Sequence, residues 1–336
     1  MVRVLDWTPT GGSARQRRAG LAWIALLGLL AGSAATPSAA QERSYRIGVL
    51  AEGRAVQLTE RVVIPHLARL GFEEGRNLAI EIHPPTPDRI ESAVRNLVAR
   101  SPDAIISIGN LALEAASRAT TEIPIVGFGP DFVGAGHARS LAQPGGNVTG
   151  VAILAEELDG KRLELLHEAV PKARRLAVLA HRRSPYKDAT ERIRAIATRH
   201  GFEVLFFEAE EKAEYAPRFE AMRASGVEGL AIRADPQFAR EGAVLAGLAR
   251  DYRLPTICQW REMAEQGCLI GYGPSLPDLY LRLADIVGRV LRGSRPAETP
   301  IEQPTRFELV INAATARALS VELPQAVLAR ADEVID

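Results

Sequence analysis

Three acidic side chains stand where they could do chemistry. Asp131, Asp235 and Glu262 each lie a few residues beyond a run of apolar residues. Carboxylates from different loops can act together as a general acid and base, or they can bind an ammonium group. The sequence lacks the spacings G-x-S-x-G, P-loop, H-E-x-x-H, C-x-x-C and EF-hand, so no activated nucleophile accompanies them. We therefore expect these carboxylates to bind a ligand, and we do not expect an enzyme.

A second group of residues suits an anion. Gly109 and Asn110 stand between an apolar run and an expected helix at 111–119. A helix N-terminus offers free N–H groups and the positive end of the helix dipole. Asn110 is also a good helix N-cap, and the two roles can coexist. The loop at 127–132 contains glycines that allow close approach to a ligand, but it lacks the third glycine of a dinucleotide site.

The histidines do not predict a metal site. The six are scattered, and no two lie three or four residues apart on one predicted helix. We expect neither a metal nor another cofactor.

The elements that position these loops form a repeat. Four apolar runs between 46 and 126 recur in the same order between 175 and 257, at offsets of 124 to 131 residues. Each run is followed by a polar loop and a helix-like segment, which indicates two copies of one β-α plan. The predicted fold class is α/β, with two Rossmann-like parallel-sheet lobes joined by crossover strands. Ligands of such sheets bind at the carboxyl ends of the strands, where the candidate loops lie.

The Pro-Gly-Gly break within 141–151 separates the two copies. We expect an N-terminal lobe of 45–148 plus about 275–300 and a C-terminal lobe of 149–272 plus about 301–336. Hinges are expected near 145–151, 270–274 and 300–305. The residues predicted to act in them are Gly146, Asn147, Thr149 and Gly271.

The first forty residues predict a secretory signal peptide. Arginines precede an apolar stretch at 21–30, and small residues end at Ala40, where we expect cleavage. The apolar stretch is shorter than the roughly 18 residues that a membrane span needs. Without residues 1–40 the chain keeps 37 basic and 40 acidic residues, so its charge does not favour nucleic acid.

The sequence contains two cysteines, Cys258 and Cys268. In an oxidising compartment they could pair. They could equally be small buried apolar residues of a packed domain, and the sequence leaves both readings open.

Several motifs in order carry a family resemblance. They include Leu70-Gly71-Phe72, Pro144-Gly145-Gly146-Asn147-Val148-Thr149-Gly150, Tyr272-Gly273-Pro274, and Gln303-Pro304-Thr305 followed by Phe307-Glu308-Leu309-Val310-Ile311-Asn312. From Tyr45 to Asp336 the chain resembles the extracytoplasmic substrate-binding proteins of ABC transporters, with the type I periplasmic-binding fold, in the tryptophan/tyrosine-type subgroup. The resemblance implies a periplasmic receptor that captures a small solute between its lobes and delivers it to a membrane permease.

The resemblance also implies which residues enclose the solute. They are Glu52, Gly109, Asn110, Pro130, Asp131, Tyr186, Asp235, Trp260, Glu262 and Tyr272. The chain departs from the family's usual residues at Gly109-Asn110 and at His181-Arg182-Arg183, so the solute is expected only to be small, with amino-acid-like and aromatic molecules as candidates.

The preferred hypothesis is a receptor for an amphipathic solute. The apolar part of the solute would stack on Trp260, Tyr272, Phe132 or Tyr186. Asn110 would bind an anionic end of the solute, and Asp131, Asp235 or Glu262 would bind a cationic end. The alternative is an exported enzyme with Asp131 and Asp235 as acid and base. A transcription regulator of the same fold would need a helix-turn-helix where the signal peptide stands.

Overall fold

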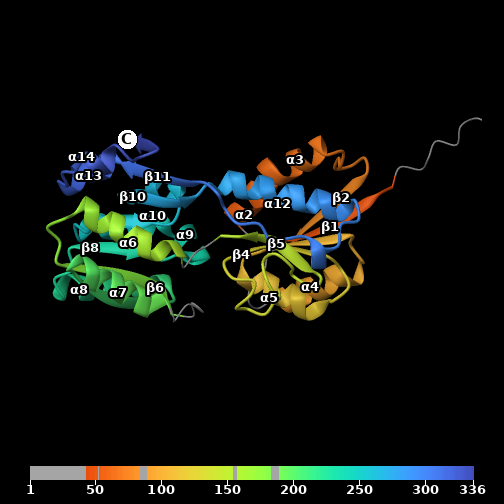
Figure 1. Ribbon diagram of the computed structural model, residues 1–336, viewed down its shortest axis with the longest axis horizontal. Helices are drawn as coiled ribbons and strands as arrows, with labels where there is room; N and C mark the ends of the chain where they lie inside the picture. Colours follow the sequence, from red (N-terminus) through yellow and green to blue (C-terminus); the bar gives the residue numbers. More distant parts are fainter. Residues whose placement is uncertain (1–42, 52, 84–88, 154–156, 183–188) are drawn as a thin grey trace, which may run out of the picture. The chain divides into compact units, whose positions relative to one another are not determined.

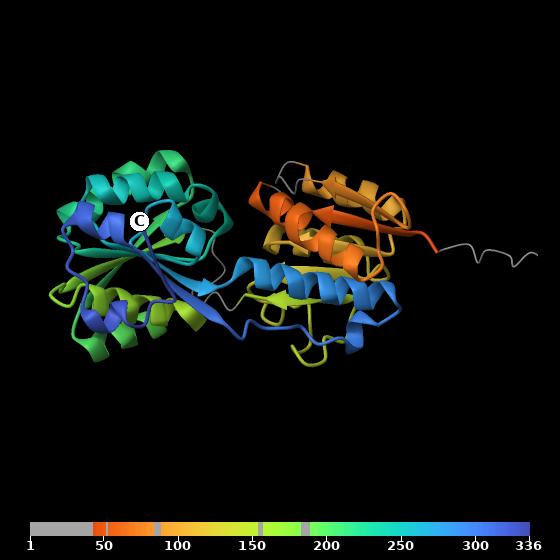
Figure 2. The same cartoon turned by 90° about the horizontal axis from the view of Figure 1, so that it is seen from above.

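The computed structural model describes residues 43–51, 53–83, 89–153, 157–182 and 189–336. The described chain forms two β-sheets, of five and seven strands, each with helices on both faces (Figures 1 and 2). We call the part built on the five-stranded sheet the first lobe and the part built on the seven-stranded sheet the second lobe. The predicted α/β fold with two parallel-sheet lobes is confirmed.

The first lobe has a wholly parallel sheet in the order β2-β1-β3-β4-β5. Its strands are short, and β3, β4 and β5 are buried along nearly their whole length, because helices cover both faces of the sheet. The strands are β1 (Tyr45–Leu50), β2 (Leu78–His83), β3 (Ala104–Ile108), β4 (Ile125–Gly129) and β5 (Val148–Ala152).

Helices from two separate parts of the chain cover the first sheet. They are α2 (Arg54–Leu58), the π-helical turn η1 (Thr59–Val63), α3 (Ile64–Arg69), α4 (Ile90–Ala99), α5 (Asn110–Ala119) and α12 (Leu276–Leu291). Helix α12 follows the second repeat in sequence, yet it lies beside α3 and packs on β3, β4 and β5 (Figures 1 and 2). Ten of its 16 residues are buried, so α12 is part of the first lobe's core.

The second lobe has a mixed sheet in the order β12-β11-β10-β9-β8-β6-β7, with β11 antiparallel to β10 and the other pairs parallel. The strands are β6 (Arg175–His181), β7 (Glu203–Ala209), β8 (Gly229–Ile232), β9 (Thr256–Cys258), β10 (Ile270–Pro274), β11 (Phe307–Asn312) and β12 (Glu333–Ile335).

Figure 2 shows α6 and α7 on one face of the second sheet and α8 and α10 on the other. The second lobe's helices are α6 (Glu157–Ala169), α7 (Ala189–His200), α8 (Lys212–Ala224), α9 (Pro236–Arg240), α10 (Gly242–Asp251), α11 (Arg261–Glu265), α13 (Ala313–Leu319) and α14 (Gln325–Leu328). The 3-10 turn η2 (Pro296–Glu298) lies beside β5 of the first sheet.

Two helices begin before the first residues that the sequence predicted, which were Leu279 and Lys161. Helix α12 begins at Leu276, because the Ser275 hydroxyl accepts a hydrogen bond from the Asp278 amide and caps the helix. Helix α6 begins at Glu157, which places Asp159 inside it, one turn before its ion-pair partner Arg162.

The predicted lobe boundary at 148/149 falls inside a strand. Strand β5 pairs with β4 from Val148 to Ala152, so Thr149 lies in the first sheet. The Thr149 hydroxyl donates to the carbonyl of Thr299, and the Asn147 amide donates to the carbonyls of Thr120 and Ile123. The first crossing between the sheets therefore comes after Ala152, later than the sequence indicates.

The other predicted hinge segments also lie within sheets or beside them. Gly271 belongs to β10, and a Cβ there would lie 2.7 Å from the Trp260 carbonyl oxygen. The Glu302 amide donates to the carbonyl of Gly150, beside the first sheet. A hinge motion through these segments stays a prediction.

The predicted signal peptide at 1–40 lies outside the described residues. No helix in the described part of the chain is long and apolar enough to cross a membrane.

Candidate ligand site

One ion pair joins the two lobes at the carboxyl ends of their strands. Arg54 opens α2, after β1, and Glu262 lies in α11, after β9. The Arg54 Nη2 atom is 2.9 Å from Glu262 Oε1. The pair therefore brings together the two sheet edges at which α/β proteins bind ligands. The sequence predicted Glu262 but missed Arg54, whose signal was its place directly after the first strand-end loop.

Glu262 is largely buried. Its side chain is 11% exposed, whereas that of Arg54 is 51% exposed. A buried carboxylate needs a positive partner, because taking it from water costs several kcal/mol. Arg54 provides that charge from the other lobe.

Three aromatic side chains belong to the elements that carry the pair or pack with those elements. Trp260, Phe128 and Tyr280 are all less than a tenth exposed and belong to one hydrophobic cluster that includes side chains of both lobes. The rings of Phe128 and Tyr280 lie 5.1 Å apart. Burial raises the pKa of the Tyr280 hydroxyl, and the charge of nearby Arg54 opposes that rise. Arg54 is thus close enough to Tyr280 for its charge to act on the hydroxyl, and it contacts the Glu262 carboxylate.

Phe128 and Tyr280 were not among the predicted site residues. Phe128 lies between two glycines at the end of β4, a pattern that allows close approach of a ligand. The sequence did not single out Tyr280, because it fits the helical periodicity of α12 and counts as an ordinary core position.

Asn110 is not the N-cap of α5. Gly109 holds that position with a φ of 89°, and Asn110 is the first helical residue. The reading of Asn110 as a cap is therefore wrong, because the glycine adopts the left-handed conformation that ends the strand-to-helix turn. Asn110 is exposed, and its Oδ1 would lie 3.4 Å from a Cβ at Gly129, so it stands beside the end of β4.

The loop after β4 is held by its own aspartate. Asp131 Oδ1 accepts hydrogen bonds from the amides of Val133, at 3.1 Å, and Gly134, at 2.8 Å. This turn accounts for Asp131 without a ligand. Pro130 before it is half-buried. Phe132 is 1% exposed and packs in the first lobe's core, and its stacking on a solute stays a prediction.

Asp235 has a similar local role in the second lobe. It caps α9, and its Oδ1 accepts from the amides of Gln237 and Phe238. Asp131 and Asp235 are thus both engaged by backbone amides of their own loops, and neither joins the Arg54–Glu262 pair.

Tyr272 lies next to a buried ionic cluster. Its carbonyl accepts a hydrogen bond from Arg162 Nε at 2.9 Å, and its half-buried ring lies 6.3 Å from that of Phe307. Asp159 binds Arg162 at 2.9 Å and Arg233 at 2.7 Å, and all three charged side chains are at least nine-tenths buried. Burial lowers the pKa of Arg162, which Asp159 partly restores. The sequence did not predict this cluster, because Arg233 is far in sequence from the two α6 residues and reaches them only in the folded chain.

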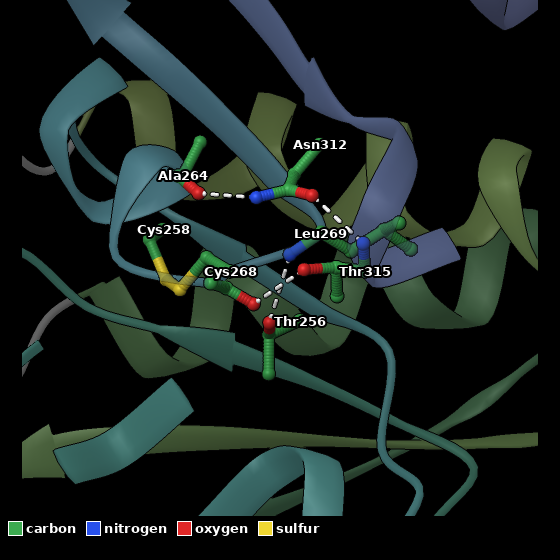
Figure 3. Close-up of a disulfide and its surroundings, with 8 residues drawn as sticks. Thr256, Cys258, Ala264, Cys268, Leu269, Asn312 and Thr315 are labelled. Carbon is green, nitrogen blue, oxygen red and sulfur yellow. Dashed lines mark hydrogen bonds between the residues drawn. A yellow bond between two sulfur atoms is a disulfide. The ribbon is translucent and has the colours of Figure 1, made fainter. Parts of the chain in front are cut away.

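The two cysteines form a disulfide in the structure (Figure 3). The bond joins Cys258 at the end of β9 to Cys268, with 6.5 Å between the Cα atoms, and it closes the loop that carries Trp260 and Glu262. The Asn312 amide donates to the Ala264 carbonyl within this loop, at 2.8 Å. The sequence left open whether the two cysteines form a disulfide or are separate buried residues, and in the structure they form the disulfide.

Three buried polar atoms at or near strand ends have no hydrogen-bond partner in the described part of the chain. They are His83 Nε2, at the end of β2, Ser107 Oγ, near the end of β3, and Gln259 Nε2, directly after β9. Such groups are costly when unsatisfied. All three were absent from the predicted site.

Two predicted site residues, Glu52 and Tyr186, lie outside the described residues. Within the described ranges, no three His, Cys, Asp or Glu side chains gather in a way that could hold a metal ion.

Two α/β lobes whose strand ends are joined by an ion pair, and which share a hydrophobic cluster with aromatic side chains, define a two-lobed ligand-binding protein with the type I periplasmic-binding fold. A family model described as ABC transporter substrate binding protein matches residues 46–335. The chain belongs to this family.

Known relatives support the same assignment. A tyrosine-binding protein of Clostridioides difficile is 23% identical over 286 residues, which are 84% of this chain and 82% of the relative. A solved conserved domain protein from Vibrio cholerae has a TM-score of 0.79 at 25% identity, covering 88% of this chain and all of the other. A Streptococcus pneumoniae ABC domain solved in complex with L-Trp has a TM-score of 0.79 at 24% identity, covering 87% of this chain and 100% of the other.

Proposed function

We propose that this substrate-binding protein captures an aromatic amino acid between its lobes and delivers it to the membrane permease of an ABC importer. The observation that carries the proposal is the Arg54–Glu262 pair, together with one hydrophobic cluster of both lobes that contains Trp260, Phe128 and Tyr280. Opposite charges next to an aromatic surface complement a molecule that has a charged backbone and an aromatic side chain. The ligands in the names of two relatives, tyrosine and L-Trp, belong to this class.

The proposal includes the place of action. The predicted signal peptide at 1–40 would direct the chain to the periplasm and be removed there. A disulfide in the site loop suits an oxidising compartment. The lobes, with boundaries near those predicted, would close on the solute by a hinge motion.

The alternative of an exported enzyme has less support. It relied on Asp131 and Asp235 as acid and base, and backbone amides of their own turns engage both carboxylates. We therefore propose a receptor without catalytic activity.

Titration calorimetry of the purified mature protein tests the function. L-Trp, L-Tyr and L-Phe are the expected ligands, with L-Leu and D-glucose as matched negative solutes. We expect saturable binding of at least one aromatic amino acid and binding of the negative solutes at least about tenfold weaker, a difference of about 1.4 kcal/mol. Binding of glucose without binding of any amino acid, or turnover of a bound solute, would contradict the proposal.

A further inference from the structure

Arg54 and Glu262 form a pair whose members come from different lobes. Arg54 is half exposed, whereas the Glu262 side chain is 11% exposed and its carboxylate touches the guanidinium at 2.9 Å. A buried carboxylate that lost this partner would need another cation, because an unpaired buried charge is strongly unfavourable. A molecule that enters between the two side chains must therefore bring a cation to Glu262, and it can offer an anion to the half-exposed Arg54.

A free amino acid carries the required complement. Its ammonium group can replace the guanidinium beside Glu262, and its carboxylate matches the two-pronged donor geometry of Arg54. We infer that Arg54 and Glu262 neutralise each other in the ligand-free protein, and that in the complex Glu262 binds the ammonium group and Arg54 the carboxylate of the amino acid. This inference rests on the proposed function and assigns the residues that recognise the charged backbone of the solute.

The neighbours of the pair fit the remaining part of such a ligand. Trp260 is two residues before Glu262, and Tyr280 lies close enough to Arg54 for the arginine charge to act on its hydroxyl. Phe128 packs against Tyr280 and belongs to the same cluster as Trp260. An aromatic side chain attached to the charged backbone would meet apolar rings next to the two charges.

A different role for the pair makes a different prediction. If the pair only held the lobes together, each substitution would change the affinity for every ligand by the same factor. If the pair binds the two charged groups, each substitution affects only ligands that carry the matching group.

The test compares L-Trp with two analogues, tryptamine, which lacks the carboxylate, and indole-3-propionate, which lacks the ammonium group. The variants are Arg54→Gln and Glu262→Gln, measured by calorimetry in the full mature chain. Matched controls are Arg61→Gln, an exposed arginine in the adjoining η1, and Glu265→Gln, in the same helix as Glu262.

We expect Arg54→Gln to weaken L-Trp binding about 10- to 100-fold, the effect of losing a hydrogen bond to a charged group, and to leave tryptamine binding undiminished. Glu262→Gln should weaken L-Trp binding to a similar extent and leave indole-3-propionate binding undiminished. The two control variants should bind all three molecules as the wild type does.

A failure of the proposed function can be distinguished from a failure of this inference. If the wild type binds no aromatic amino acid, the proposed function fails. If the wild type binds L-Trp but both variants weaken L-Trp and its analogues by one common factor, or change nothing, the function stands and the inference is overturned. Because Arg54 is half exposed, its variant decides the matter even if Glu262→Gln unfolds the protein.

Discussion

The loop after β9 of the second lobe is cross-linked, whereas the loop after β4 of the first lobe is held by hydrogen bonds within its own turn. A disulfide closes the loop that carries Trp260 and Glu262, and side chains of β11 and α13 hydrogen-bond to its backbone. The first lobe's loop depends on Asp131 and two backbone amides. The comparison indicates that a covalent bond constrains the loop with Trp260 and Glu262, whereas weaker interactions hold the loop after β4.

The largest effect should come from the ionic cluster of the second lobe. Asp159→Asn removes the carboxylate charge that Arg162 and Arg233 share. We expect a loss of about 3–5 kcal/mol in the free energy of unfolding, because two buried guanidinium groups lose the charge of Asp159. Urea denaturation of the purified variant measures this loss.

The control for this prediction is Glu164→Gln in the same helix. Glu164 pairs with Lys161, whose side chain is 39% exposed, so its removal should cost less than about 1 kcal/mol. Equal losses of unfolding free energy in the two variants would show that the burial of the cluster does not add to stability. The second lobe would then have no stability advantage over the first from this cluster.

A smaller effect is expected from removing the disulfide. The double variant Cys258→Ala, Cys268→Ala opens a short loop, for which the chain-entropy estimate is about 2–3 kcal/mol of stability. Affinity for the solute should also fall, because Trp260 and Glu262 lose their fixed loop. Calorimetry and urea denaturation, with reduced wild-type protein as the control, measure both quantities. Unchanged affinity would show that the second lobe's surface does not need the cross-link.

The smallest effect is expected in the first lobe. Asp131→Ala removes the acceptor of two backbone amides and should cost about 1 kcal/mol, whereas Asp131→Asn retains an acceptor oxygen and should cost less. Hydrogen exchange should show faster amides at Val133 and Gly134 in the alanine variant. If Asp131→Asn instead abolished solute binding at full stability, Asp131 would be a ligand residue and not a turn residue.

Much of the fold could be predicted from the sequence. Runs such as Ala104–Ile108 are apolar along nearly their whole length, which is typical of parallel strands buried on both faces. Their repetition in one order indicated two lobes. Boundaries were less accurate where a side chain decides them, as Ser275 does by capping α12 directly before Leu276.

The candidate site was harder to predict, for physical reasons. The pairing of Arg54 with Glu262 depends on how two separate sheets meet, and no local pattern contains that information. The loop after β4 did contain a usable signal, because an aspartate three residues before a glycine favours a turn closed by the carboxylate. Reading that signal would have assigned Asp131 to the turn.

The position of α12 has a consequence for how the chain folds as it is synthesised. Helix α12 packs on the first sheet, yet it is made only after most of the second lobe. The second sheet in turn lacks β11 and β12 until residues 307–335 have been made. Domains usually fold one after another from the N-terminus, but here both must wait for the last part of the chain. A nascent chain that stops before α12 would leave the apolar surface around Leu67 and Val63 uncovered and open to aggregation.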